Sequence, residues 1–154
     1  MSGFTTFLIA LPVVTLVNLA WQWFLEYTGL PTQQQDLLRM FTEAKEPVLI
    51  GTMVVLAVAI APITEELLFR ATLYRYLRTR VPRVVALWLP GTIFAALHVS
   101  WGTLDGLASL LPLVVLAVIF SIAYERTGQI ATAMIAHALF NLHTVLLLVS
   151  GVSS

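Results

Sequence analysis

The chain contains no cysteine and very little charge. Its 154 residues include only eight basic and eight acidic side chains, so the formal net charge at pH 7 is zero. The absence of cysteine excludes disulfides, thiolate nucleophiles and cysteine-bound metals. The sparse and balanced charge provides no basic surface for nucleic acid.

Apolar residues fill the sequence instead. They make up 59% of the chain against 10% charged residues, and the mean hydropathy is +0.92. A soluble domain is roughly 45–50% apolar and about 25% charged. This composition predicts an all-α polytopic transmembrane helix bundle, with residues 1–154 forming a single membrane domain. The N-terminal segment has neither a basic start nor a small-residue cleavage site, which favours a retained helix over a signal peptide.

Five apolar segments are long enough to be membrane helices. They lie at about Phe4–Leu25, Pro47–Ile63, Val84–Val99, Leu104–Tyr124 and Ile130–Val149. The second continues to Arg80, and one straight helix of that length would reach about 50 Å against a hydrocarbon core of about 30 Å. Because proline removes a helix hydrogen bond, we predict a break at Pro62, with Thr64 capping a new helix.

The arginines predict the orientation. Four of them crowd the short stretch from Arg75 to Arg83, and Arg126 lies in a second loop that this topology places on the same side. Basic loops are typically cytoplasmic. We therefore expect a multi-pass protein of a bacterial plasma membrane, with the Arg75–Arg83 loop in the cytoplasm and the connector 28–46 on the opposite side.

Six polar side chains lie within or beside the apolar segments. Counted from the arginine-rich side, four of them lie at similar depths, about 14–21 Å into the membrane. These four are Glu65 of the second segment, His98 of the third, and His137 and Asn141 of the fifth. Several polar groups at one level indicate a polar cavity inside the bundle. The six are Glu65, Glu66, Arg70, His98, His137 and Asn141.

Local spacing predicts which of these groups pair on the second segment. Glu66 and Arg70 are four residues apart and share a helix face, so they can form an ion pair. Glu65 is rotated by about 100° from Glu66 and lacks that partner. A carboxylate without a cationic partner suits a general base.

The two histidine segments show similar spacing. His137 and Asn141 are four residues apart and point the same way, as do Phe94 and His98. An aromatic wall can therefore flank the His98 imidazole. His143 falls on a different face from His137, and we interpret it as structural.

Three motifs carry a resemblance to a known family. EELLFR (EExxxR), FAALH (FxxxH) and HALFN (HxxxN) occur in this order, each on its own apolar segment. The chain resembles the CPBP family of CAAX proteases and bacteriocin-processing enzymes, also called type II CAAX prenyl endopeptidase-like proteins. APITEELLFRATLYRYL and YERTGQIATAMIAHALFN are similar to family members beyond the motif letters. The similarity covers about residues 47–145, the expected protease core.

The resemblance implies an intramembrane endopeptidase acting on a peptide or protein, including a prenylated CAAX-type substrate. It implies that Glu65 and His98 hold and activate the attacking water, and that Glu66 and Arg70 orient them.

For the fifth segment, the resemblance implies that His137 and Asn141 stabilise the oxyanion. Family members have been described both as metal-dependent and as glutamate-dependent without a catalytic metal. Two alternatives therefore stay open: Glu65, His98 and His137 form a His₂Glu zinc set, or the same groups act without metal by acid–base catalysis.

A non-catalytic alternative uses the same residues. A bacteriocin-immunity or scaffold protein could keep them as a buried polar network, and a proton pathway is a third, less favoured reading. Other intramembrane proteases do not fit, because the chain has no HExxH or GxSG motif and its single lysine, Lys45, lies in the polar connector. Family members often have about eight helices, whereas about five are expected here.

Overall fold

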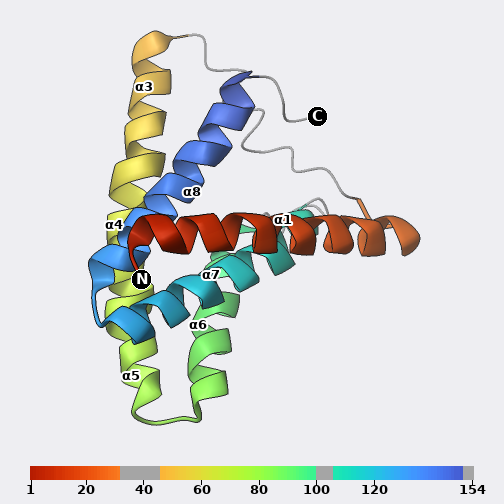
Figure 1. Ribbon diagram of the computed structural model, residues 1–154. Coiled ribbons are helices and arrows are strands. Elements are labelled where there is room, and N and C mark those ends of the chain that lie inside the picture. Colours follow the sequence, from red (N-terminus) through yellow and green to blue (C-terminus); the bar gives the residue numbers. More distant parts are fainter. Residues whose placement is uncertain (32–45, 100–105, 151–154) are drawn as a thin grey trace.

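The computed structural model of the chain describes residues 1–31, 46–99 and 106–150, and these form helices and short connections without strands. This confirms the all-α prediction. Most of the connector 28–46 and the predicted start of the fourth segment at Leu104 lie outside the described residues. The helices are α1 (Gly3–Tyr27), α3 (Pro47–Val55), η1 (Leu56–Ile60), α4 (Ala61–Glu66), η2 (Leu67–Tyr74), α5 (Arg75–Arg78), α6 (Arg83–His98), α7 (Leu107–Thr127) and α8 (Ile130–Ser150) (Figure 1).

Length and composition identify membrane-spanning candidates among these helices. Four helices of the described part are long and apolar enough to cross a membrane, at Gly3–Tyr27, Pro47–Arg78, Leu107–Thr127 and Ile130–Leu148. α6 is apolar but shorter, with 16 residues. The chain is thus a polytopic helix bundle, with four candidate spans and one shorter apolar helix among its described residues.

The elements α3 to α5 form one continuous helix, residues 47–78, which we call the long helix. The predicted break at Pro62 is wrong, and so is the predicted cap at Thr64. The Thr64 hydroxyl instead donates back to the carbonyls of Ile60 and Ala61, both at 3.0 Å. The π-helical turn η1 ends at Ile60, two residues before this proline. A wider π turn gives room where a proline ring would otherwise crowd the carbonyl one turn earlier.

The long helix and α6 form a hairpin (Figure 1). The predicted Arg75–Arg83 loop is shorter in the structure: Arg75 and Arg78 lie in α5, Arg83 begins α6, and the connection covers residues 79–82. We keep the name arginine-rich loop for residues 75–83. Glu125, near the end of α7, forms ion pairs with Arg78 at 3.0 Å and with Arg83 at 2.8 Å. The end of α7 that carries Arg126 therefore lies at the same end of the bundle as the arginine-rich loop.

α1 covers α7 and α8 through a buried core in which half of the residues are alanine. The buried cluster there consists of Ala10, Val14, Leu116, Phe120, Ala133 and Ala136. Small residues allow helix backbones to approach closely, which is the usual basis of helix packing in membranes. The indole N–H of Trp21 also donates to the Leu107 carbonyl at 2.8 Å, which ties the C-terminal part of α1 to the start of α7.

Candidate active site

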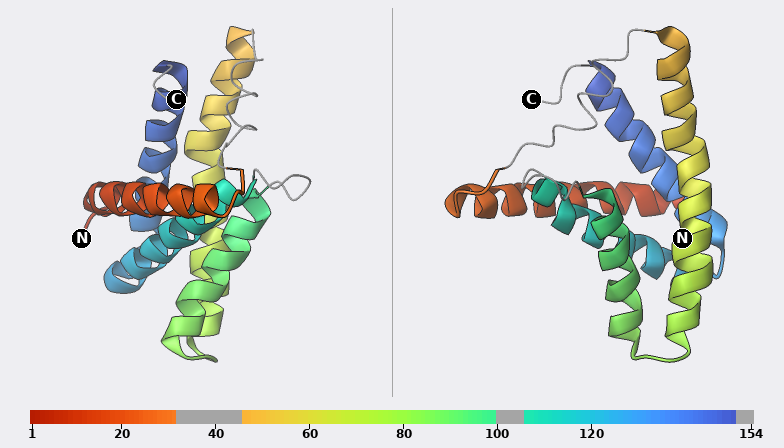
Figure 2. Two further views of the ribbon diagram at one scale, coloured as in Figure 1. Left: turned by 90° about the vertical axis from the view of Figure 1, so that its right-hand side faces the viewer. Right: turned by 180° about the vertical axis from the view of Figure 1, so that it is seen from behind.

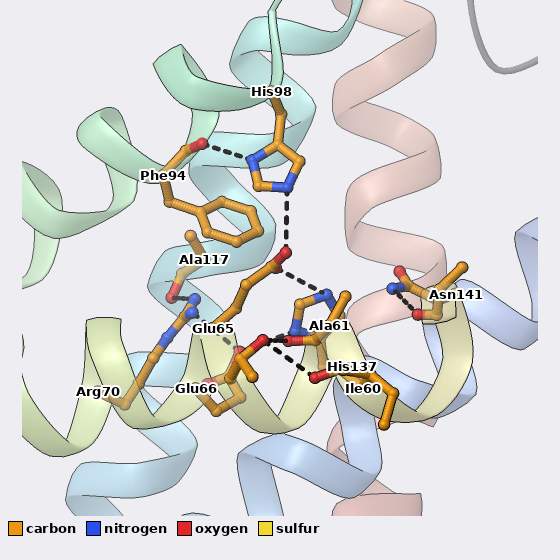
Figure 3. A network of polar contacts seen from close by, with 12 residues as sticks. Ile60, Ala61, Glu65, Glu66, Arg70, Phe94, His98, Ala117, His137 and Asn141 are labelled. Carbon is orange, nitrogen blue, oxygen red and sulfur yellow. Dashed lines mark hydrogen bonds and ion pairs between the residues drawn. The ribbon is translucent and has the colours of Figure 1, made fainter. Parts of the chain in front are cut away.

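Polar side chains from three helices meet inside the bundle, as the depth estimate predicts. The long helix supplies Glu65, Glu66 and Arg70, α6 supplies His98 and α8 supplies His137 (Figure 3). Asn141, the sixth residue of the predicted set, bonds instead to the backbone of the long helix.

The inner half of the site is buried. Glu66, Arg70 and His137 are 0%, 1% and 3% exposed. The predicted pair forms, because Arg70 NH1 donates to Glu66 Oε1 at 2.9 Å. His137 Nδ1 lies 2.9 Å from the same oxygen. An ionised carboxylate paired with arginine has no hydrogen to donate and can only accept. His137 therefore carries a hydrogen on Nδ1 and donates it to Glu66.

α7 supports this half of the site although it carries no residue of the three motifs. Arg70 NH2 donates to the Ala117 carbonyl at 3.0 Å. The guanidinium carbon also lies 5.3 Å from the centre of the Phe94 ring and 5.5 Å from that of Phe120, within cation–π range. Phe120 in turn contacts His137, with ring centres 5.3 Å apart. A phenylalanine and a backbone carbonyl in an apolar run have no distinctive sequence pattern, so the sequence did not identify them.

The outer half of the site is more accessible. The side chains of Glu65 and His98 are 24% and 37% exposed. His98 Nδ1 lies 2.7 Å from the Phe94 carbonyl, and because a carbonyl oxygen only accepts, this nitrogen is the donor. The Phe94 ring packs against the imidazole in a tilted arrangement, with centres 4.3 Å apart, which confirms the predicted aromatic wall.

Glu65 faces both histidines through their second nitrogens. Its Oε1 lies 3.6 Å from His98 Nε2, and its Oε2 lies 3.7 Å from His137 Nε2. Both distances exceed a direct hydrogen bond, and polar groups at such a separation are suited to a bridging water. The arrangement can therefore hold a water molecule against a carboxylate.

The zinc alternative requires three side chains that converge on one ion. In the part of the chain that the structure describes, no group of three histidine, cysteine or acidic residues is arranged to hold a metal ion. The two Nε2 atoms instead approach different oxygens of Glu65. The donor set as arranged does not fit a zinc centre, and we derive no chemical step through a metal.

Asn141 points at the backbone of the long helix. Its Nδ2 donates to the carbonyl of Ala57, in η1, at 2.8 Å (Figure 3). His137 and Asn141 thus both contact the long helix, consistent with their common face, but they do so at different points. His143 contacts the Phe7 ring of α1, with centres 6.2 Å apart, on another side of α8.

The fold and the site define a helical membrane protein with a glutamate–histidine site between its helices. The family described as type II CAAX prenyl endopeptidase Rce1-like matches residues 47–143, which include all six predicted site residues. Because this match covers more than half of the sequence, the chain belongs to that family of membrane proteases. No match to a curated protein or to a solved structure was found.

Proposed function

We propose that the chain is an intramembrane endopeptidase in which Glu65 is the general base. The observation that carries this proposal is the position of the Glu65 carboxylate, which is partly exposed and faced by imidazoles from two other helices. An accessible carboxylate beside two histidines within apolar helices is costly to keep in a membrane and is typical of a functional site.

The proposed reaction is hydrolysis of a peptide bond. A water molecule is held by Glu65 and by His98 Nε2, which in the neutral ring can accept a hydrogen bond. Glu65 takes one proton as the water oxygen bonds to the scissile carbonyl carbon, and the carbonyl electrons move onto its oxygen. When the C–N bond breaks, Glu65 returns that proton to the leaving nitrogen, so the products are a carboxylic acid and an amine. The acid then loses its remaining proton to the amine or to water. Such proton transfer contributes roughly 10²–10⁴-fold to the rate.

His137 is the proposed oxyanion donor. Its Nδ1–H is committed to Glu66, so Nε2 donates only when the ring carries both protons. Glu65 and Glu66 face the two ring nitrogens, and both are suitable ion-pair partners for an imidazolium. A donor fixed in this way stabilises negative charge as it develops on the carbonyl oxygen.

The surroundings of Glu65 favour a hydrophobic substrate. Leu68, three residues after Glu65 and therefore on the same side of the long helix, is 57% exposed. We propose a membrane-associated peptide as the substrate, with a lipidated CAAX-type C-terminus as the form that the family description names. A non-catalytic scaffold would need the buried Glu66–Arg70–His137 network but not an accessible Glu65.

The test is cleavage of quenched fluorescent peptides by the purified protein in detergent. A farnesylated CAAX-type peptide and its unprenylated counterpart are compared with wild type, Glu65→Gln and the control Glu26→Gln, whose carboxylate is exposed on α1. We expect Glu65→Gln to lose cleavage while keeping its helical content, and Glu26→Gln to remain active.

Two further readouts belong to this experiment. Full activity in Glu65→Gln would contradict the proposed base. Each protein is also assayed with and without a chelator, and a loss of activity with chelator would require a metal in the reaction. Preference for the farnesylated peptide would assign lipid recognition to the chain.

A further inference from the structure

Pro62 leaves a carbonyl of the long helix without its backbone donor. At the end of η1, the N–H of Ala61 bonds to the carbonyl of Leu56, five residues earlier. Pro62 follows as the second residue of α4. If the π register continued by one more residue, the N–H of residue 62 would bond to the carbonyl of Ala57. Proline has no N–H, so the ladder cannot supply this bond.

The side chain of Asn141 supplies the missing donor from another helix. Its Nδ2 lies 2.8 Å from the Ala57 carbonyl oxygen. A backbone carbonyl without a partner is costly inside a membrane, because no water is available there to satisfy it. The proline and the asparagine are therefore complementary: one removes a hydrogen-bond donor and the other replaces it.

This bond lies close to the proposed catalytic groups. Pro62 precedes Glu65 by three residues, and His137 precedes Asn141 by one turn of α8. His137 bonds to Glu66 and Asn141 bonds to Ala57, so α8 holds the long helix at two points that flank Pro62. Two such bonds fix the rotation of the long helix relative to α8, and with it the direction of Glu65.

We infer that Asn141 is a positioning residue that acts through the Ala57 carbonyl left free by Pro62. The effect that we expect Asn141 to have on catalysis rests on the proposed endopeptidase function, whereas its expected effect on the structure does not. The inference predicts that Asn141 is needed only while position 62 is a proline.

The test restores the backbone donor. Pro62→Ala provides an N–H at position 62, so Pro62→Ala/Asn141→Ala should recover what Asn141→Ala loses. We expect Asn141→Ala to lower kcat on the order of 100-fold, the scale of a misplacement of about 1 Å, with little change in KM and a lower Tm. Asn141→Asp, which keeps the shape but cannot donate when ionised, should behave in the same way.

Controls separate this rescue from a general effect of removing proline. Pro112 lies inside α7, and Pro112→Ala should not rescue Asn141→Ala. Pro62→Ala alone should stay close to wild type, because a carbonyl oxygen has two lone pairs and can accept from both donors.

A third readout does not require cleavage. The chain has only three histidines, so ¹⁵N-histidine labelling gives an assignable imidazole signal for His137. We expect the Nδ1–H signature of His137 to change in Asn141→Ala and to return in the double variant. If wild type cleaves no peptide, the proposed function fails, while the NMR signal and the Tm still decide the inference.

Two outcomes would overturn the inference. If neither Tm nor the His137 signal recovers in the double variant, Asn141 does not act through the Ala57 carbonyl. If both recover but kcat does not, Asn141 acts directly on the substrate and is not a positioning residue.

Discussion

Two adjacent glutamates in this chain have different surroundings because one residue rotates a helix by about 100°. Glu66 is completely buried and bonds to Arg70 and His137. Glu65 is partly exposed and faces His98 and His137 at longer distances. Glu66 is therefore suited to hold the site together, and Glu65 to react.

This difference predicts that the same substitution changes stability by very different amounts at the two positions. Glu66→Gln leaves the buried Arg70 charge without its anionic partner, and we expect the free energy of unfolding to fall by about 3–5 kcal/mol. Glu65→Gln removes only longer contacts of an accessible carboxylate, and we expect a change below about 1 kcal/mol. Denaturant unfolding in detergent measures both, and equal losses would contradict the division of roles.

Local spacing predicted only part of the site. The Glu66–Arg70 ion pair and the Phe94–His98 ring contact follow from residues four apart on one helix, and this separation can be read from the sequence. The bond between Glu66 and His137 joins residues 71 positions apart. It depends on how two helices are rotated against each other, which no local pattern specifies.

At the scale of elements, the hydrophobic pattern located the helices but not the shape of the long helix. The predicted break at Pro62 used a rule for α-helices, in which proline both removes a bond and crowds a carbonyl. The chain instead continues through a π turn, and Asn141 satisfies the freed carbonyl. A compensating contact from residue 141 cannot be read from the sequence around residue 62.

The contact between α6 and α7 predicts a second effect on the site. A Cβ at Gly91 would lie 3.3 Å from the Val114 carbonyl and 3.5 Å from the Ala117 Cβ. Gly91→Val should overpack this contact and cost about 1–3 kcal/mol of unfolding free energy. Because His98 lies two turns further along α6, we also expect cleavage activity to fall.

Gly51 provides the matched control for this substitution. It is also helical, but a Cβ there would meet no heavy atom within 4 Å. Gly51→Ala should raise the free energy of unfolding by about 0.5–1 kcal/mol, because glycine costs about that much in a helix. The same unfolding experiment measures both variants. A Gly91→Val protein as stable and active as wild type would show that α6 does not need this close approach.

At the scale of the molecule, the contacts of α1 define how it is placed. A Cβ at Gly3 would lie 2.5 Å from the Ile135 Cβ, so the N-terminus of α1 packs near the start of α8. Trp21, in the C-terminal part of α1, bonds to Leu107 at the start of α7, the opposite end of α7 from the one that leads into α8. α1 therefore runs antiparallel to α7.

Figure 2 shows that α1 also runs across the direction of the long helix. The two helices have 25 and 32 residues. At 1.5 Å per residue they measure about 38 and 48 Å, longer than a hydrocarbon core of about 30 Å. Helices with this excess length can cross each other and still both span a bilayer when each is tilted.

This geometry, combined with the orientation that the sequence predicts for the arginine-rich loop, predicts the side of the membrane on which each end of α1 lies. The chain has no native cysteine, so Ser2→Cys, Thr28→Cys and Thr79→Cys each introduce a unique thiol at an exposed position. In intact cells we expect a membrane-impermeant maleimide to label Thr28→Cys but neither Ser2→Cys nor Thr79→Cys. Permeabilised cells, in which all three should react, are the control. Labelling of Thr79→Cys in intact cells would reverse the orientation, and equal labelling of Ser2→Cys and Thr28→Cys would show that α1 does not cross the membrane.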